Sequence, residues 1–278
     1  MRYLRMVTVI LFVISVLFAA WANYHYFSQL NTDYPCITNT VEELHLSVQD
    51  PPEAMLEGLT AADATDGDLT DRIMVASVSH FLEPGTVRVK YVVFDDHNNS
   101  ATLTRRVHYT DYTPPTFSLD KTPVYTVGSS MDLLKHVQVQ DCLDGDITDQ
   151  IRVLSNMVNN YSVGVYPVVL EVSNSCGDTA QITIWVTYLS KENTANVALH
   201  QYIVYHTQGD TFDPKRWSTS VTDRSNNALD MSKIEVLGNL DVETPGVYSL
   251  AYNYTDGKLA GQSTLTVVVT ERGDSNGG

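Results

Sequence analysis

The sequence predicts an all-β protein of three tandem, two-layered sheet domains behind one N-terminal helix. An acidic string in residues 63–73 is nearly repeated in residues 141–151, an offset of 141 − 63 = 78. Three stretches that each follow a glycine alternate apolar and polar residues, as half-buried strands do: residues 87–95, 166–174 and 248–256. Beyond the leader, helical periodicity is absent. Loops tolerate Asp and Gly where strands do not, so each acidic string marks one loop of a repeated domain.

Length and charge narrow the classes of function. At 278 residues, the chain accommodates three copies of roughly 80 residues each, and each copy is large enough to bury a core. The formal net charge of −16 argues against a nucleic-acid partner, because a phosphate backbone would be repelled. Divalent cations are the natural electrostatic partner, although an acidic surface also serves solubility alone.

Residues 1–27 read as a signal anchor or a signal peptide. Residues 6–20 carry no charge and follow two arginines, and no Lys or Arg comes after them until Arg72. The positive-inside rule therefore places the rest of the chain outside the cytoplasm. Ala20-Trp21-Ala22 has the form of a signal-peptidase site, whereas Trp21 and Tyr24 resemble the aromatic belt of a retained helix. We expect a single-pass, uncleaved anchor in the cell membrane; a secreted protein is the alternative.

A polar linker, residues 28–35, leads to the first domain, residues 36–111. In it, residues 41–48 predict an opening strand, and further strands follow at 55–61 and 73–78. The remaining boundaries follow from polar or proline-rich junctions and from the repeat: residues 112–190 for the second domain, 196–270 for the third and 271–278 for a disordered tail. Sandwiches stacked end to end would form a rod of about 100 Å.

With these residues laid out, the chain resembles the tandem bacterial immunoglobulin-like domains of surface proteins, a group first noted in insecticidal crystal proteins. The resemblance covers residues 36–270 and rests on Asp-x-x-Asp-Gly-Asp-[Leu/Ile]-Thr-Asp-x-Ile in two copies and on the alternating strand after Gly in all three. In the third copy the acidic string has decayed to Asp223-Arg-Ser-Asn226, and this copy looks closer to a sister group. The resemblance implies three immunoglobulin-like β-sandwiches that serve as spacers or adhesive modules, without catalytic residues.

The acidic loop of the first domain is a candidate Ca²⁺ site. In an immunoglobulin-like sandwich the loop after the second strand and the hairpin before the last strand lie at the same end. That arrangement would bring oxygen ligands together from Asp63, Asp66, Asp68 and Asp95. The alternative is structural: Asp and Thr side chains satisfy the turn backbone while Gly67 and Gly145 supply positive φ.

The same geometry brings Cys142 near Cys176, and we expect a disulfide between them because thiols outside the cytoplasm usually oxidise. Two unpaired cysteines are the alternative. Cys36 is left over, and no lipidation motif precedes it.

No residue set in the sequence amounts to a reaction mechanism: a nucleophile elbow, a zinc-binding His-Glu-x-x-His and a phosphate loop are all absent. We therefore expect a non-enzymatic spacer or adhesive protein that contacts a protein partner. The alternative is a module that binds cell-wall or host glycan, with Trp185 and Trp217 as candidate platforms. The tripeptide Arg272-Gly273-Asp274 is explained by chance.

Overall fold

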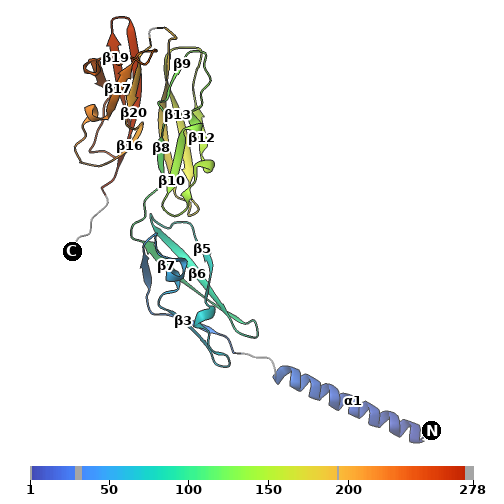
Figure 1. Cartoon of the computed structure of the whole chain (residues 1–278). Helices are drawn as coiled ribbons and strands as arrows, with labels where there is room; N and C mark the ends of the chain where they lie inside the picture. The colour runs from blue at the N-terminus through green and yellow to red at the C-terminus, as the bar shows by residue number, and fades with distance from the viewer. Residues whose placement is uncertain (1, 29–32, 193, 273–278) are drawn as a thin grey trace. The chain divides into compact units, whose positions relative to one another are not determined.

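The computed structural model describes residues 2–28, 33–192 and 194–272, and it confirms the all-β fold class. The chain divides into two compact units, residues 1–110 and 111–278. Beyond the N-terminal helix, the described helical segments are short 3₁₀ turns of three to five residues (Figure 1). The sheets therefore carry the cores.

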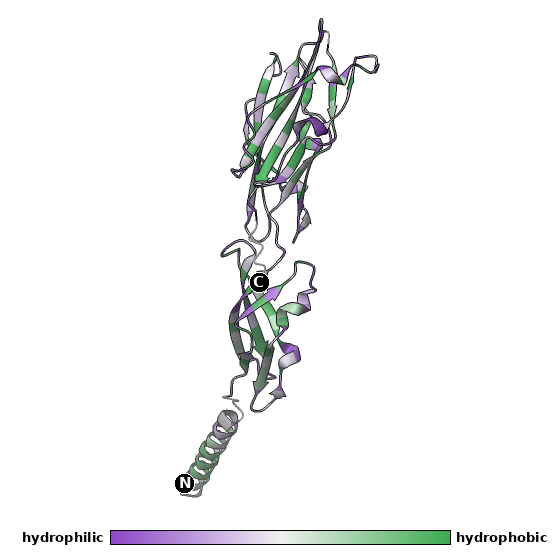
Figure 2. Cartoon of the chain, turned by 90° about the vertical axis from the view of Figure 1, so that its left-hand side faces the viewer, coloured by the Kyte–Doolittle hydropathy of each residue, from purple (hydrophilic) through white to green (hydrophobic). Residues whose placement is uncertain are grey.

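The N-terminal helix α1 spans Arg2–Ser28. Its segment Arg5–His25 is long and apolar enough to cross a membrane, and none of it is buried against the rest of the protein. Figure 2 shows the hydrophobic colouring along this helix. A signal sequence has the same features, so the helix is compatible with either predicted fate.

The first unit contains one sandwich of two sheets. One sheet has the order β1-β3-β4 and the other the order β2-β7-β6-β5. The strands are β1 Cys36–Asn39, β2 Glu43–Leu46, β3 Leu59–Asp63, β4 Gly67–Asp68, β5 Met74–Val78, β6 Thr86–Phe94 and β7 Ser100–Tyr109. Alternate side chains of β6, from Val87 to Val93, are fully buried, as its period-two pattern predicts.

The predicted opening strand, residues 41–48, contains the single strand β2, Glu43–Leu46, but it is not the first strand, because β1, Cys36–Asn39, precedes it. β1 pairs antiparallel with β3 in one sheet, and β2 pairs parallel with β7 in the other. The chain changes sheets between these two strands. The predicted strand at 55–61 is divided between the 3₁₀ turn η1, Pro52–Leu56, and strand β3.

A buried arginine fixes η1 to the core of the first sandwich. Arg105 on β7 is 4% exposed, and its guanidinium donates to the main-chain oxygens of Met55 and Glu57. Its Nε also donates to the Tyr91 hydroxyl at 3.1 Å, and Tyr91 in turn donates to Met55 O at 2.8 Å. These bonds supply the donors and acceptors that make burial of a guanidinium tolerable.

The second unit contains two further sandwiches. The second sandwich has sheets ordered β11-β10-β8 and β12-β13-β14-β9, and the third has β15-β17 and β16-β20-β19-β18. The strands of the second are β8 Thr116–Leu119, β9 Val124–Thr126, β10 Val137–Asp141, β11 Gly145–Asp146, β12 Arg152–Asn156, β13 Gly164–Ser173 and β14 Thr179–Leu189. Those of the third are β15 Asn196–Leu199, β16 Ile203–Thr207, β17 Ser218–Thr222, β18 Ile234–Leu237, β19 Gly246–Asp256 and β20 Leu259–Thr270.

The second and third sandwiches lie side by side, which corrects the expected end-to-end stack for this pair. β14 packs against β20, and β8 lies beside β16 (Figure 1). One continuous hydrophobic cluster runs from Phe117 to Val269 through both sandwiches. The predicted residue ranges for the domains stay predictions, but these two do not have separate cores.

Local contacts at the junction explain this packing. Ala195, at the end of the connecting segment, is buried, and its N–H donates to Ala260 O at 2.9 Å. Gly261 is required beside it, because a Cβ there would lie 2.4 Å from Ala195 O. On the edge strand β8, the N–H of Phe117 donates to the Tyr205 hydroxyl of β16 at 2.7 Å, so the third sandwich satisfies a donor that an edge strand leaves unpaired.

Candidate functional site

The acidic string of the first sandwich folds as a tight turn at the end of β3. The N–H groups of Thr65 and Asp66 donate to Asp63 Oδ1 at 2.8 and 3.0 Å. Gly67 follows with a φ of 78°, a left-handed conformation that a residue without Cβ adopts readily. The N–H of Thr70 then donates to Asp68 Oδ1 at 2.9 Å, and the Thr70 hydroxyl is the main reason that the pKa of Asp68 is lowered.

The second sandwich repeats this turn. The N–H groups of Leu143 and Asp144 donate to Asp141 Oδ1 at 3.0 and 2.9 Å, and the N–H of Thr148 donates to Asp146 Oδ1 at 3.0 Å. The repeated string therefore has a structural role in both copies, as the structural interpretation predicted.

The hairpin between β6 and β7 brings a second set of polar groups to this loop. The N–H groups of His97 and Asn99 donate to Asp95 Oδ1 at 2.9 and 2.7 Å, and Asn99 Nδ2 donates to Asp95 Oδ2 at 2.7 Å. Burial of Asp95 raises its pKa, but the hydrogen bonds from Asn99 and His97 outweigh this effect, so the pKa is lowered overall. These groups stabilise an ionised, buried carboxylate.

The structure brings together two of the four predicted cation ligands and adds one that the sequence reasoning missed. The ligand atoms of Asp66, Asp95 and His97 lie within 4.8 Å of one another. The N–H of Asp96 also donates to Asp66 Oδ2 at 2.8 Å, which ties the turn to the hairpin. Asp68 is not in this group. His97 has one signal in the sequence: it lies at the position of Cys176 in the next repeat, 176 − 97 = 79 residues on.

The two predicted disulfide partners lie at the corresponding end of the second sandwich. Cys142 Sγ donates to Thr113 O at 3.1 Å, and burial raises the pKa of the Cys176 thiol, to which Cys142 adds a smaller electrostatic contribution. All three cysteines are present as free thiols. The Cys142–Cys176 pairing is therefore not confirmed and stays a prediction.

The two candidate aromatic platforms do not form one flat, exposed surface. Trp185 on β14 is half-buried. Trp217 is also half-buried, because its ring stacks on Phe212 with centroids 5.9 Å apart. Both rings therefore contribute part of their area to packing within the second unit.

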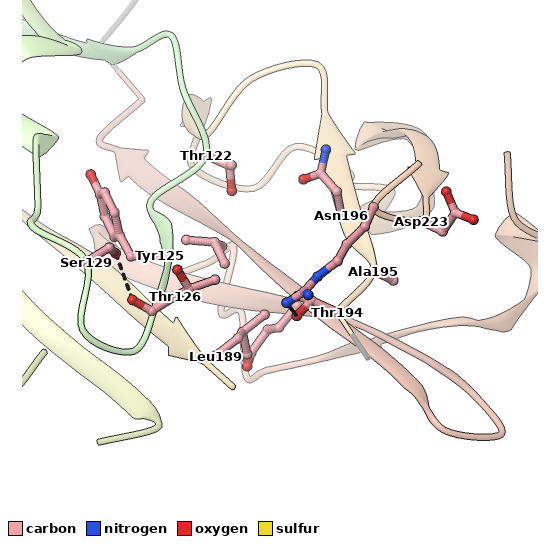
Figure 3. A pocket seen from close by; sticks show the side chains of 12 residues that line it. Thr122, Tyr125, Thr126, Ser129, Leu189, Thr194, Ala195, Asn196 and Asp223 are labelled. Carbon is pink, nitrogen blue, oxygen red and sulfur yellow. Dashed lines mark hydrogen bonds between the residues drawn. The ribbon is translucent and has the colours of Figure 1, made fainter. Parts of the chain in front are cut away.

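A pocket of about 370 Å³ lies between the second and third sandwiches, and its lining combines polar side chains with the apolar Val124, Leu189 and Ala195 (Figure 3). Its lining is rich in hydroxyl, amide and charged groups: Thr122, Thr126, Ser129, Thr194, Asn196, Asp223, Arg224 and Gln262. The Arg224 guanidinium donates to Thr194 Oγ1 at 3.5 Å, and the Ser129 hydroxyl donates to Thr126 O at 2.7 Å.

Comparison with known proteins gives one curated relative and several distant structural likenesses. The chain is 31% identical over 226 residues to the pesticidal crystal protein Cry22Aa of Bacillus thuringiensis; the match covers 77% of this chain and 30% of that protein. No family model matches the sequence. The chain thus spans less than a third of the length of this relative.

Among solved structures, the chain is similar to CBM51-2 with INT domains from Clostridium perfringens ZmpB, in complex with GlcNAc, at 18% identity and a TM-score of 0.23. That match covers 53% of this chain and 26% of the other. It is also similar to Drosophila N-cadherin EC1-3, at 11% identity and a TM-score of 0.29, covering 84% of this chain and 99% of the other.

Proposed function

We propose that the protein is a non-enzymatic, membrane-anchored module that holds its sandwiches outside the cytoplasm, where they act as a spacer or contact another protein. The observation that carries this proposal is the fully exposed apolar segment Arg5–His25 directly before the sheet domains. Such an exposed apolar segment is expected either to be inserted in a bilayer or to be cleaved from the mature protein. The similarity to a crystal protein supports the sheet-domain part of the proposal.

Membrane extraction and protease protection test the anchor. The full-length protein should pellet with membranes, resist carbonate extraction and expose its sandwiches to protease added outside spheroplasts. Recovery of a soluble protein that begins at Asn23 would instead show that the leader is cleaved. Protection of the sandwiches from the added protease would contradict the proposed orientation.

The edge strands β5 and β12 are the proposed protein-contact surfaces. Each is the outermost strand of its sheet, and each exposes apolar side chains that a partner strand would cover, among them Met74, Val78 and Leu154. An exposed edge offers unpaired main-chain groups to an added strand. Both strands contain a register shift, between Val75 and Ser77 and between Val153 and Ser155, which limits uncontrolled pairing.

Glycan binding is the second candidate, and the polar side chains that line part of the pocket between the second and third sandwiches favour it. Sugar hydroxyl groups are recognised by amide, hydroxyl and charged side chains of the kind that line this pocket. The half-buried state of Trp185 and Trp217 argues against the aromatic platform that the sequence suggested.

Binding of the full-length protein in nanodiscs to panels of matrix proteins and glycans separates the two candidates. Contact through the edge predicts binding to a protein that Leu154→Lys weakens about tenfold or more, whereas Arg224→Ala leaves it unchanged. Glycan binding predicts that Arg224→Ala weakens binding to a glycan about tenfold or more, whereas Leu154→Lys leaves it unchanged. Protein binding that neither Leu154→Lys nor a matching Val78→Lys weakens would exclude the edge strands as the contact surface.

A further inference from the structure

One buried carboxylate oxygen in the first sandwich has no hydrogen-bond partner among the residues that the structure describes. Asp63 is 7% exposed; its Oδ1 accepts two N–H groups of the turn, and its Oδ2 accepts none. An ionised oxygen that is buried without a donor or a cation is unfavourable by several times the thermal energy. This atom is an independent sign, beyond the acidic cluster itself, that a positive group belongs beside it.

The second sandwich shows what faces this oxygen. Asp141 holds the equivalent position and is 6% exposed, and Asn174 Nδ2 donates to its Oδ2 at 3.2 Å. Asp95 stands at the position of Asn174, an offset of 174 − 95 = 79. In this comparison Asp63 corresponds to Asp141. The first sandwich therefore has a carboxylate where the second has an amide.

The two side chains at this hairpin position have the same orientation. The N–H of Asn99 donates to Asp95 Oδ1 at 2.7 Å, and the N–H of Asp178 donates to Asn174 Oδ1 at 2.9 Å. Asp95 Oδ2 thus takes the place of the Asn174 amide nitrogen, and a donor is replaced by an acceptor. By this comparison with the second repeat, Asp63 Oδ2 would have the Asp95 carboxylate beside it in place of an amide donor, and Asp95 is one member of the Asp66, Asp95 and His97 group.

A second exchange between the repeats increases the negative charge at the same place. Asp144 is satisfied by Ser175, whose N–H and hydroxyl donate to its two oxygens at 2.6 and 2.7 Å. In the first sandwich Asp96 replaces Ser175, so the hydroxyl donor to Asp66 is lost. The Asp96 carboxylate is itself paired with Arg72 at 2.7 Å.

We propose that this end of the first sandwich binds one divalent cation through Asp66, Asp95 and the His97 imidazole, with the unpaired Asp63 Oδ2 as a further oxygen whose charge the ion offsets, and that the second sandwich does not. Carboxylate oxygens suit Ca²⁺ and Mn²⁺ alike, whereas an imidazole ligand favours Mn²⁺ or Zn²⁺. The cation would join the turn after β3, in one sheet, to the hairpin after β6, in the other. This inference is independent of the proposed partner and of the fate of the leader.

Calorimetric titration and thermal melts of the full-length, chelator-treated protein in detergent test the proposal, with CaCl₂, MnCl₂ and ZnCl₂ in separate arms. The wild type should bind at least one ion with a Kd of about 10⁻⁴ to 10⁻³ M, and saturation should raise one melting transition by about 5 °C. Asp95→Asn, which reproduces the second sandwich, should weaken binding at least tenfold and melt higher than the wild type without metal. A tenfold loss of Mn²⁺ or Zn²⁺ affinity in His97→Ala would identify the imidazole as a ligand.

The matched control is Asp144→Asn, the equivalent of Asp66→Asn in the other repeat. It should leave cation binding unchanged, whereas Asp66→Asn should weaken it. Equal losses in the two variants would mean that the ions bind diffusely to acidic surface, and the absence of binding to all three ions at about 5 mM would also overturn the proposal. If Asp95→Asn does not fold, unchanged affinity in Asp66→Asn contradicts the proposal just as directly.

Discussion

Single residues decide how the repeated acidic string is used. The side chains of the string accept turn hydrogen bonds in both copies. On the facing hairpins, however, Asp95 has a carboxylate oxygen where Asn174 has an amide nitrogen. That difference changes a donor into an acceptor beside a buried carboxylate. The chemistry of the site therefore depends on a residue outside the motif that first attracts attention.

Asp132 in the second sandwich gives a pH-dependent prediction. Lys121 Nζ donates to both of its oxygens at 3.2 and 2.9 Å, and this contact is the main reason that the pKa of Asp132 is lowered from 3.8 to about 2. A depressed pKa stabilises the folded state fully above the unfolded value and progressively less as the pH falls from about 3.8 to about 2. Asp132→Asn should therefore lower the urea midpoint at pH 7 and have little effect at pH 2.

Urea titrations of the wild type and the variant at both pH values check this expectation. Asp149→Asn, at an exposed position of the same sandwich, serves as the control and should not change the midpoint at either pH. An Asp132→Asn effect of equal size at pH 2 and pH 7 would show that the carboxylate charge contributes nothing.

The cysteines give a second prediction at this scale. Thiol labelling of the denatured protein, purified without reductant, should detect one reactive thiol per chain, that of Cys36, because Cys142 and Cys176 lie at the same end of the second sandwich. In the chain-entropy model, the loop that a Cys142–Cys176 disulfide closes would stabilise the second sandwich by about 3 kcal/mol. Two or three reactive thiols per chain would contradict the pairing.

At the scale of elements, strand β20 depends on Gly261. Its main chain approaches Ala195 so closely that a methyl group would meet the carbonyl oxygen and carbon at 2.4 and 2.9 Å. Backbone atoms cannot swing aside as a flexible side chain can. Gly261→Ala should therefore destabilise the second unit by about 1 to 3 kcal/mol, the usual cost of overpacking.

Chemical denaturation followed by Trp185 and Trp217 fluorescence measures this change, because both reporters lie in the second unit. Ala260→Ser, at the exposed neighbouring position, is the control and should shift the midpoint by less than about 0.5 kcal/mol. A wild-type midpoint in Gly261→Ala would show that the connecting segment moves away without cost.

At the scale of the whole molecule, the three predicted repeats lie in two compact units. The second and third sandwiches share a continuous core, whereas residues 1–110 form a compact unit of their own. Scanning calorimetry should therefore show two unfolding transitions. Tyr205→Phe, which removes the acceptor for Phe117 N–H, should lower only the transition of the second unit, by about 1 to 3 kcal/mol of stability.

Three separate transitions, or a Tyr205→Phe variant that splits the second unit into two melting events, would show that the sandwiches of this unit fold independently. Scanning calorimetry with added divalent cation assigns the other transition, that of residues 1–110. A metal-dependent shift should appear only in the transition that Tyr205→Phe leaves unchanged.

Much of the fold and part of the candidate site could be predicted without coordinates. The period-two stretches become β6, β13 and β19 because alternation in a strand places every second side chain in the core. Asp66 and Asp95 were predicted to meet from the order of strands in a sandwich, and they do. His97 was missed, because its approach to Asp66 depends on another loop and no local pattern distinguishes it from a surface histidine.

The sequence alone determined the sheet class, the repeat and the apolar leader, because these follow from periodicity and composition within short stretches of chain. Only the tertiary structure decided that two of the three copies share a core and that an orphaned carboxylate oxygen lies in the first copy. Both depend on the positions of residues far apart in the chain, such as Ala195 and Gly261, or Asp66 and Asp95. Local sequence patterns do not reveal these positions, because the residues come close together only when the sheets pack.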